Sequence, residues 1–392
     1  MAYDFDNVPS RKGTYSFKFD FAEKMGHDPD ELPMWVADMD FPSPPGVAEA
    51  ICSYAQQGFF GYSDAMDDYA DAVIGWFERR HGITYDRDWL VRTPGVVFAI
   101  NNAVCAFTNP GDAVLIQTPV YQPFALAARL NGRKLVENEL VYNPEATPSY
   151  TIDFEDFERK IDDFEVKVFV LCSPHNPVGR VWTAEELARM GAICAKHDVL
   201  IVSDEVHCDL LLYGNRHIPF LTACPEMASR TVVCTAPSKT FSLAGLQTSN
   251  IWIPDDDLRK SFCDQLASIG HFSTNLLGII ACKAAYETGD DWLDEAIAYI
   301  QGNVDYQRSF LEAELPQLKL VEPQGTYLTW VDMSALGMEA GELDSFVQHK
   351  AKLWLDGGSM FVSGGDQFQR FNLACPRSTV VEAMNRLKAA IG

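Results

Sequence analysis

Residues 231–245, TVVCTAPSKTFSLAG, begin with a short β-branched run that is typical of a buried strand. The run breaks at Ala236-Pro237, and Lys239 follows directly. Ligand crevices of parallel α/β sheets lie beyond the carboxyl ends of the strands, so this lysine is well placed for chemistry. A partly desolvated amine has a lowered pKa and can act as a nucleophile and as a base. Taken alone, the motif also fits an ordinary solvated lysine, because most lysines are solvated.

Two further buried runs end in polar side chains. The run KVFVLC ends at Cys172 and leads into SPHNPVGR, and the run VLIVS leads into Asp204. Asn176, Asp204 and Lys239 therefore each follow a strand, and parallel strands bring such ends to one rim of the sheet. Pyridoxal 5'-phosphate (PLP) requires a lysine for its aldehyde, a carboxylate for its pyridine nitrogen and an amide for its ring hydroxyl oxygen. The sequence therefore predicts a PLP site at this rim.

Strand and helix patterns alternate between residues 90 and 240, which predicts an α/β fold with a parallel sheet covered by helices. One such helix is expected over 184–197, with Thr183 as its N-cap residue. Residues 257–315 are expected to be largely helical. The segment TYLTWVD, residues 326–332, alternates between apolar and polar residues like a strand of a second, smaller sheet.

Composition narrows the class of protein. The chain has 392 residues, 47% of them hydrophobic, which is enough for a large core and two domains. A formal net charge of −24 argues against nucleic acid or an anionic membrane as a partner. The N-terminus lacks the pattern of a signal peptide, and no run is long enough to span a membrane, so we expect a cytoplasmic protein. The ten cysteines are scattered and do not cluster with histidines as zinc ligands do, so no metal site is expected.

The cofactor phosphate needs hydrogen-bond donors. Gly95 stands at a turn before a predicted helix, where the backbone N–H groups of Gly95, Val96 and Val97 can form an anion site. The hydroxyls of Thr235 and Ser238, on either side of the break before the lysine, are further expected donors.

Several motifs resemble those of one enzyme family. SPHNPVGR, SDEVH, APSKTFSLAG and RFNLACPR look like the motifs of the PLP-dependent fold type I aminotransferase superfamily (class I/II). MWVADMDFPSPP (34–45) and TPGVVFAINNAV (93–104) resemble its MalY/PatB-type branch of cystathionine and cysteine-S-conjugate β-lyases. This resemblance implies a large PLP-binding domain (46–288) with a mostly parallel seven-stranded sheet. It also implies a smaller α+β domain (289–392), joined by an N-terminal arm (1–45).

The resemblance also implies roles for individual residues. Tyr121 matches the aromatic residue that stacks on the pyridine ring, and it is counted with Lys239 and Asp204 among the catalytic residues. Tyr62 matches a tyrosine that reaches across a homodimer interface to the phosphate of the other subunit; an aromatic plug in a turn is the alternative. Arg370 matches the arginine that binds the substrate α-carboxylate, for which a bidentate guanidinium is suited.

Other positions leave alternatives open. Val36 and Ala37 match a segment that lies against the substrate, although a plain domain-crossing loop fits them equally well. His207 stands where many aminotransferases have a tyrosine, and it either hydrogen-bonds the cofactor or simply packs. Gln247 replaces an arginine that binds the phosphate in many aminotransferases. Gln122 replaces a second tyrosine that some relatives carry, which puts any proton-transfer role there in doubt.

These observations predict a PLP-dependent carbon–sulfur lyase. In the expected β-elimination, Lys239 removes the Cα proton of cystathionine or another cysteine S-conjugate, and Asp204 keeps the pyridine nitrogen protonated. The products would be a thiol, pyruvate and ammonia. Aminotransfer uses the same residues and is the alternative. A PLP-binding regulator that acts through a protein partner is a third, more remote reading.

Overall fold

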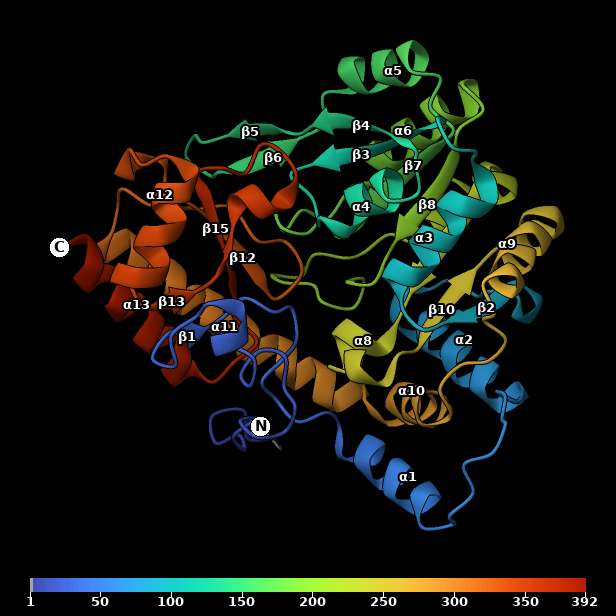
Figure 1. Cartoon of the computed structure of the whole chain (residues 1–392), viewed down its shortest axis with the longest axis horizontal. Helices are drawn as coiled ribbons and strands as arrows, with labels where there is room; N and C mark the ends of the chain where they lie inside the picture. Colours follow the sequence, from blue (N-terminus) through green and yellow to red (C-terminus); the bar gives the residue numbers. More distant parts are fainter. Residues whose placement is uncertain (1–2) are drawn as a thin grey trace.

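A computed structural model describes residues 3–392 of the chain (Figure 1). Its largest sheet has seven strands in the order β2-β10-β9-β8-β7-β3-β4. The strands are β2 (Leu90–Thr93), β3 (Ala113–Thr118), β4 (Lys134–Glu139), β7 (Val168–Cys172), β8 (Leu200–Asp204), β9 (Thr231–Thr235) and β10 (Ser249–Trp252). Among these seven, β10 alone runs opposite to the other six. The α/β fold class with a mostly parallel seven-stranded sheet is therefore confirmed.

Helices cover both faces of this sheet. The α-helices of the described chain, including those beside the smaller sheet, are α1 (Pro45–Ala55), α2 (Asp67–His81), α3 (Val96–Phe107), α4 (Pro123–Arg129), α5 (Phe154–Asp163), α6 (Ala184–Lys196), α7 (Phe220–Ala223), α8 (Pro237–Thr240), α9 (Asp256–Ser268), α10 (Leu276–Thr288), α11 (Asp290–Glu314), α12 (Ala340–Ser345) and α13 (Arg377–Ile391). Val168 and Val170 of β7 pack in one apolar core with α3, α4 and α9, whereas Phe169 and Leu171 pack with α5 and α6. This alternation follows the period of two of a strand buried on both faces.

A smaller antiparallel sheet lies beside the large one, in orange and red in Figure 1. Its strands are β11 (Lys319–Leu320), β12 (Leu328–Asp332), β15 (Phe368–Asn372) and β14 (Asp356–Gly357). The remaining strands are β5 (Val141–Asn143) with β6 (Ser149–Thr151), and β1 (Leu32–Pro33) with β13 (Leu353–Trp354).

The parallel β1–β13 pair ties the N-terminal segment to the part of the chain that forms the smaller sheet, as Figure 1 shows at the blue segment. On this basis we propose the division into an arm (1–45), a large domain (46–288) and a small domain (289–392). No helix among residues 3–392 is long and apolar enough to cross a membrane.

The carboxyl ends of the parallel strands share one rim, as their register requires. Cys172 at the end of β7 pairs with Asp204 at the end of β8, and Asp204 pairs with Cys234 near the end of β9. Because β10 runs the opposite way, its first residues lie at this same rim: Asn250 pairs with Thr235. The rim therefore collects the carboxyl ends of six parallel strands and the beginning of β10.

Candidate active site at the carboxyl rim of the large sheet

A cavity of about 170 Å³ opens at this rim. Its lining brings together residues from the ends of β2, β3, β7, β8 and β9, from the start of β10 and from the N-terminal segment. The lining residues are Ala37, Pro94, Gly95, Val96, Val97, Tyr121, Cys172, Asn176, Asp204, Val206, His207, Ser238, Lys239, Ala244 and Thr248. Ten of the expected site residues thus line one cavity: Ala37, Gly95, Val96, Val97, Tyr121, Asn176, Asp204, His207, Ser238 and Lys239.

Lys239 lies in the short helix α8, one residue after Ser238. Its Nζ donates a hydrogen bond to the backbone carbonyl of Ala37 at 2.7 Å. Burial, followed by the nearby positive charge of Arg370, lowers the pKa of Lys239 to about 8. The side chain is nevertheless partly accessible from the cavity. A free amine with this pKa is a competent nucleophile and base near neutral pH.

Asp204 ends β8 and is buried. Burial raises the pKa of its carboxyl to about 7, although a hydrogen bond from the Val206 backbone N–H (3.0 Å to Oδ1) and the charge of Lys239 act in the opposite direction. A carboxylate in such a setting gains most from a cationic partner in the cavity. His207, three residues on, has a ring Nδ1 that is buried and without a hydrogen-bond partner.

Arg370, in β15, approaches the cavity from the smaller sheet. Its Nη1 donates to Asn176 Oδ1 at 3.0 Å and its Nη2 donates to the carbonyl of Trp35 at 2.8 Å. The guanidinium also forms an ion pair with Asp356, the residue directly opposite it on β14. Burial raises the pKa of Asp356, and the Arg370 charge opposes that rise. Sequence analysis did not identify Asp356, because the register of β14 against β15 is not readable from the chain.

The part of the cavity expected to receive the cofactor phosphate, here called the phosphate corner, lies at the N-terminus of α3. Gly95 has φ 172°, which is extended backbone that any residue adopts, and a Cβ there would meet nothing within 4 Å. Neither the backbone conformation at Gly95 nor the space around its Cα therefore requires glycine at this turn. No arginine, and no lysine other than Lys239, lines the cavity in the described part of the chain. An anion here would meet the N–H groups of α3 and the hydroxyls of Ser238 and Thr248.

Besides Arg370 and Gln122, four expected or doubtful positions lie outside the cavity. The Thr235 hydroxyl donates to the carbonyl of Asn250 at 2.9 Å and accepts from Trp252, so the structure does not place it with the phosphate donors. Val36 does not line the cavity either; its carbonyl accepts from Asn372 at 2.6 Å. Tyr62 and Gln247 also lie elsewhere: Tyr62 is fully exposed, at 109%, and Gln247 is exposed.

Tyr327, Thr248 and Ala244 belong to the site but escaped sequence analysis. The Tyr327 hydroxyl donates to the carbonyl of Ala37 at 2.9 Å, so it shares this acceptor with Lys239. The alternation of residues 326–332 indicated a strand, and that pattern alone does not show that a tyrosine at its start reaches the lysine. Thr248 and Ala244 follow the lysine in the loop that returns to β10, whose direction is not readable from the chain.

A buried polar network lies beneath the lysine helix. Among the described residues, His81, Cys208 and Asp209 form one group of potential metal ligands. The Asp209 carboxylate already accepts hydrogen bonds from Trp76 (3.0 Å), His81 (2.7 Å) and Thr240 (2.7 Å). Burial alone would raise the pKa of Asp209, and these bonds, that from His81 first, bring it below its ordinary value. The network therefore ties α2 to the helix that carries the lysine.

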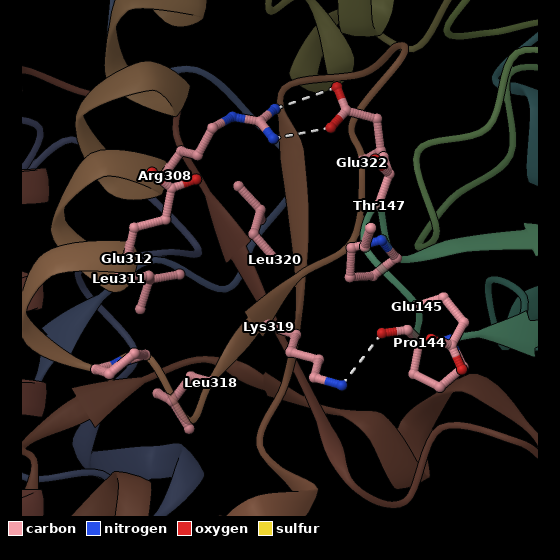
Figure 2. Close-up of a pocket in the computed structure, with 13 residues that line it drawn as sticks. Pro144, Glu145, Thr147, Arg308, Leu311, Glu312, Leu318, Lys319, Leu320 and Glu322 are labelled. Carbon is pink, nitrogen blue, oxygen red and sulfur yellow. Dashed lines mark hydrogen bonds and ion pairs between the residues drawn. The ribbon is translucent and has the colours of Figure 1, made fainter.

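A larger hollow of about 700 Å³ lies elsewhere, between the β5–β6 connection and the end of α11 (Figure 2). Arg308 and Glu322 form two hydrogen bonds across it, at 2.8 and 3.2 Å, and Lys319 donates to the carbonyl of Pro144 at 3.1 Å. Arg308 and Glu322 therefore satisfy each other, and Lys319 is bound to a backbone carbonyl. The hollow contains none of the side chains at the sheet rim, so we do not assign the chemistry to it.

The fold and the site define a class: a large, mostly parallel sheet with a lysine, a carboxylate and an amide at its carboxyl rim, and a small sheet that supplies an arginine. The chain belongs to the aminotransferase class I and II family, whose sequence model matches residues 30–387.

Individual relatives indicate to which branch of this family the chain belongs. Cystathionine β-lyase PatB of Bacillus subtilis (strain 168) is 43% identical over 388 residues, which cover 99% of this chain and 100% of that protein. Cystalysin from Treponema denticola, whose crystal structure contains a PLP cofactor, superposes with a TM-score of 0.95 at 38% identity, covering 100% of this chain and 99% of that one. The PLP-bound C–S lyase from Staphylococcus hominis gives a TM-score of 0.91 at 34% identity, covering 99% and 98% of the two chains. The expected MalY/PatB-type membership is confirmed.

Proposed function

We propose that this protein is a PLP-dependent carbon–sulfur β-lyase that converts cystathionine or other cysteine S-conjugates to a thiol, pyruvate and ammonia. The observation that carries the proposal is that Lys239, Asp204 and Asn176, which leave three different strands, line a single cavity beside Arg370. The relatives named above include a cystathionine β-lyase and a C–S lyase that cover nearly the whole chain, which supports the same reaction.

The residues of the cavity fit PLP. Asp204 offers a carboxylate whose burial favours a cationic partner, which the pyridine nitrogen supplies. Asn176 accepts from Arg370 through Oδ1, so its amide N–H₂ group can turn to the ring oxygen. The unpartnered Nδ1 of His207 marks an unmet hydrogen bond in the same wall. Tyr121, 37% exposed at the cavity, can cover the ring face.

Lys239 is the residue that would be joined to the cofactor and would later move the substrate proton. With a pKa of about 8, its amine is available as a base close to neutral pH. When bound, PLP supplies the electron sink that makes the Cα–H bond of the amino acid acidic. With Lys239 taking up the Cα proton, the sulfur substituent would leave Cβ as a thiolate, and hydrolysis of the released enamine would give pyruvate and ammonia.

Arg370 orients the substrate. Its guanidinium is held in place by Asn176, Trp35 and Asp356, so it meets a substrate carboxylate without first having to be ordered. Its ion pair with Asp356 means that substrate binding adds a second carboxylate to one guanidinium. The planar guanidinium has five N–H donors and can donate to both carboxylates.

A homodimer with shared sites is part of the proposal. Tyr62 is fully exposed, and Phe59, Phe60 and Phe272 are also exposed large apolar side chains. Tyr62 and Phe60 line a common surface hollow with residues 273–277. Exposed aromatic residues of this kind mark surfaces for protein contact. A second copy of the chain that covered this surface could receive Tyr62 at its own phosphate corner.

The decisive experiment measures pyruvate from cystathionine without any keto-acid acceptor. We expect the PLP-loaded protein to release pyruvate continuously, and the Lys239→Ala variant to lose both this activity and the visible absorbance of the bound cofactor. An absolute requirement for an acceptor would instead favour aminotransfer. A wild-type protein that stays colourless after incubation with PLP would remove the basis of the proposal.

A further inference from the structure

Residues 35–38, here called the strap, contact two charged side chains of the site, Lys239 and Arg370, through their backbone carbonyl groups. The carbonyl of Trp35 accepts from Arg370 at 2.8 Å, and the carbonyl of Ala37 accepts from Lys239 at 2.7 Å. Asn372, two residues after Arg370, donates to two further strap carbonyls at 2.6 Å each. The position of this one backbone segment therefore helps to set the positions of both charged groups of the site.

Two cations of the N-terminal arm hold the strap and the residues just after it. Arg11 forms ion pairs with Asp38 (2.6 Å) and Asp40 (3.3 Å), and it also donates to the carbonyl of Met39 at 3.0 Å. Lys18, which is fully buried, donates to both carboxylate oxygens of Asp40 at 2.9 Å. Asp40 therefore has two cations, whereas Arg11 is the only cation that the structure pairs with Asp38 among residues 3–392.

Asp38 is the member of this cluster that acts on the lysine. It follows Ala37, whose carbonyl accepts from Lys239 Nζ, and its buried Oδ1 has no hydrogen-bond partner among residues 3–392. Its negative charge favours the charged form of Lys239 and so opposes the burial and the Arg370 charge that lower the pKa of that amine. The extent of this opposition depends on how completely Arg11 offsets the Asp38 charge.

We propose that Arg11 is a positioning residue which, by pairing with Asp38, keeps that carboxylate from holding Lys239 in its protonated form. The inference rests on the proposed role of Lys239 as the reactive amine. The charged and titratable groups around this amine come from several elements: Asp38 on the strap, Asp204 at the end of β8 with His207 after it, Tyr121 after β3, Tyr327 before β12, and Arg370 on β15. Of these, only Asp38 is paired with a cation from the N-terminal arm.

A purely mechanical role for Arg11 predicts something different. If Arg11 served only to fix the strap, removal of the Asp38 charge would do nothing to repair an Arg11 variant. If the effect is electrostatic, the two changes should cancel, because Asp38→Asn removes the negative charge that Arg11→Met leaves uncompensated. A double-mutant cycle separates these outcomes.

The test titrates Lys239 in the cofactor-free, full-length protein. An amine-acylating reagent is applied across a pH series, and the labelled Lys239 peptide is quantified by mass spectrometry. We expect Arg11→Met to raise the midpoint of labelling by about one pH unit and Asp38→Asn to lower it by a similar amount. The Arg11→Met/Asp38→Asn double variant should return close to wild type. A double variant that behaves like Arg11→Met, or an unchanged midpoint in both single variants, would overturn the proposal.

Two controls sharpen the result. Arg308→Met removes a comparably exposed arginine from its ion pair with Glu322, remote from the cavity, and should leave the midpoint unchanged. Arg11→Lys retains the charge and should stay near wild type; a raised midpoint in this variant would mean that the geometry of Arg11, and not its charge, carries the effect. If Arg11→Met fails to fold, Arg11→Gln takes its place in the same cycle with Asp38→Asn, with the same expected result. The readout does not involve turnover, so a protein that releases no pyruvate would count against the lyase and leave the Arg11 result intact.

Discussion

Two residues of the cavity have pKa values that burial shifts in opposite directions. Because burial disfavours the charged form of each group, the pKa of Asp204 is raised to about 7 and the pKa of Lys239 is lowered to about 8. The Coulomb attraction between them only partly offsets this effect. The cavity is therefore costly to the folded protein until a partner for both groups is bound.

This cost predicts a pH-dependent gain in stability for Asp204→Asn in the cofactor-free protein. A carboxyl whose pKa rises on folding, here from 3.8 to about 7, costs nothing below 3.8, and its cost grows as the pH rises to about 7. The stability difference between Asp204→Asn and wild type should therefore increase between pH 4 and pH 7, by up to about 4 kcal/mol, and then level off. Urea unfolding at a series of pH values measures it. A difference that is flat across this range would contradict the assigned shift.

Arg370 calls for a paired variant, because its removal alone leaves Asp356 buried without a partner. A broken buried ion pair costs roughly 3–5 kcal/mol, so Arg370→Met by itself confuses folding with binding. The Arg370→Met/Asp356→Asn variant should keep its cofactor and raise KM for the amino acid by about tenfold or more. Steady-state kinetics and PLP titration check this. Weakened PLP binding with an unchanged KM would move Arg370 out of the substrate site.

At the scale of elements, α6 formed as its sequence predicted. The expected helix 184–197 is observed as Ala184–Lys196, with Thr183 as N-cap in a reciprocal capping box with Glu186. The Glu186 backbone N–H donates to the Thr183 hydroxyl at 3.2 Å, and the Thr183 N–H donates to the Glu186 carboxylate at 2.9 Å. The N-cap role of Thr183 depends on residues close in sequence, which is why it could be predicted; the reciprocal bond with Glu186 is an addition that the structure makes.

The capping box predicts a defined loss of stability. Thr183→Ala should lower the free energy of unfolding by about 1 kcal/mol, because one backbone donor of the first turn loses its partner. Thr183→Ser retains the hydroxyl and should stay within a few tenths of wild type. Chemical denaturation of the PLP-loaded protein measures both. Equal losses in the two variants would mean that the methyl group, rather than the cap, carries the effect.

Around the lysine, some features could be predicted from the sequence and others could not. The strand Thr231–Thr235 and the lysine after it follow from local pattern, as do Asn176 and Asp204. The four-residue helix that carries Lys239 was not anticipated, because one turn is too short to show a period. The sequence predicts Thr235 as a phosphate donor, but in the structure its hydroxyl donates to Asn250 of the neighbouring strand β10. Whether a side chain at a strand end faces the rim or the next strand depends on a pairing that the sequence does not state.

At the scale of the whole molecule, the site is assembled from distant parts of the chain. Asp356 contacts Arg370 because β14 and β15 pair within the smaller sheet, and Tyr327 contacts Ala37 because this sheet lies against the strap. No local motif contains such pairs, so they could not be predicted without a structure. The net charge of −24 places these contacts in an acidic protein, and the described lining of the cavity offers an anion N–H and hydroxyl groups and one lysine.

A shared-site homodimer predicts complementation between two inactive chains. In a hybrid of Tyr62→Ala and Lys239→Ala subunits, one site contains an intact Lys239 and receives an intact Tyr62, whereas the other lacks both. Co-expression should therefore recover about a quarter of wild-type activity, since half of the dimers are hybrid and each has one native site. Pyruvate release by the purified mixture measures this recovery. The absence of recovery, with hybrid dimers demonstrated by differential tags, would show that Tyr62 acts within its own subunit or not at all.

The reversed direction of β10 has one more consequence. Because β9 and β10 are hydrogen-bonded neighbours, the loop between Thr235 and Ser249 leaves and re-enters the sheet at almost the same place. Both of its ends are therefore anchored while Lys239 is held between them. A single residue inserted into this loop would leave the two strands paired and the melting behaviour nearly intact, yet it would carry the amine away from its target. One inserted residue in this loop would therefore abolish activity and leave the protein folded.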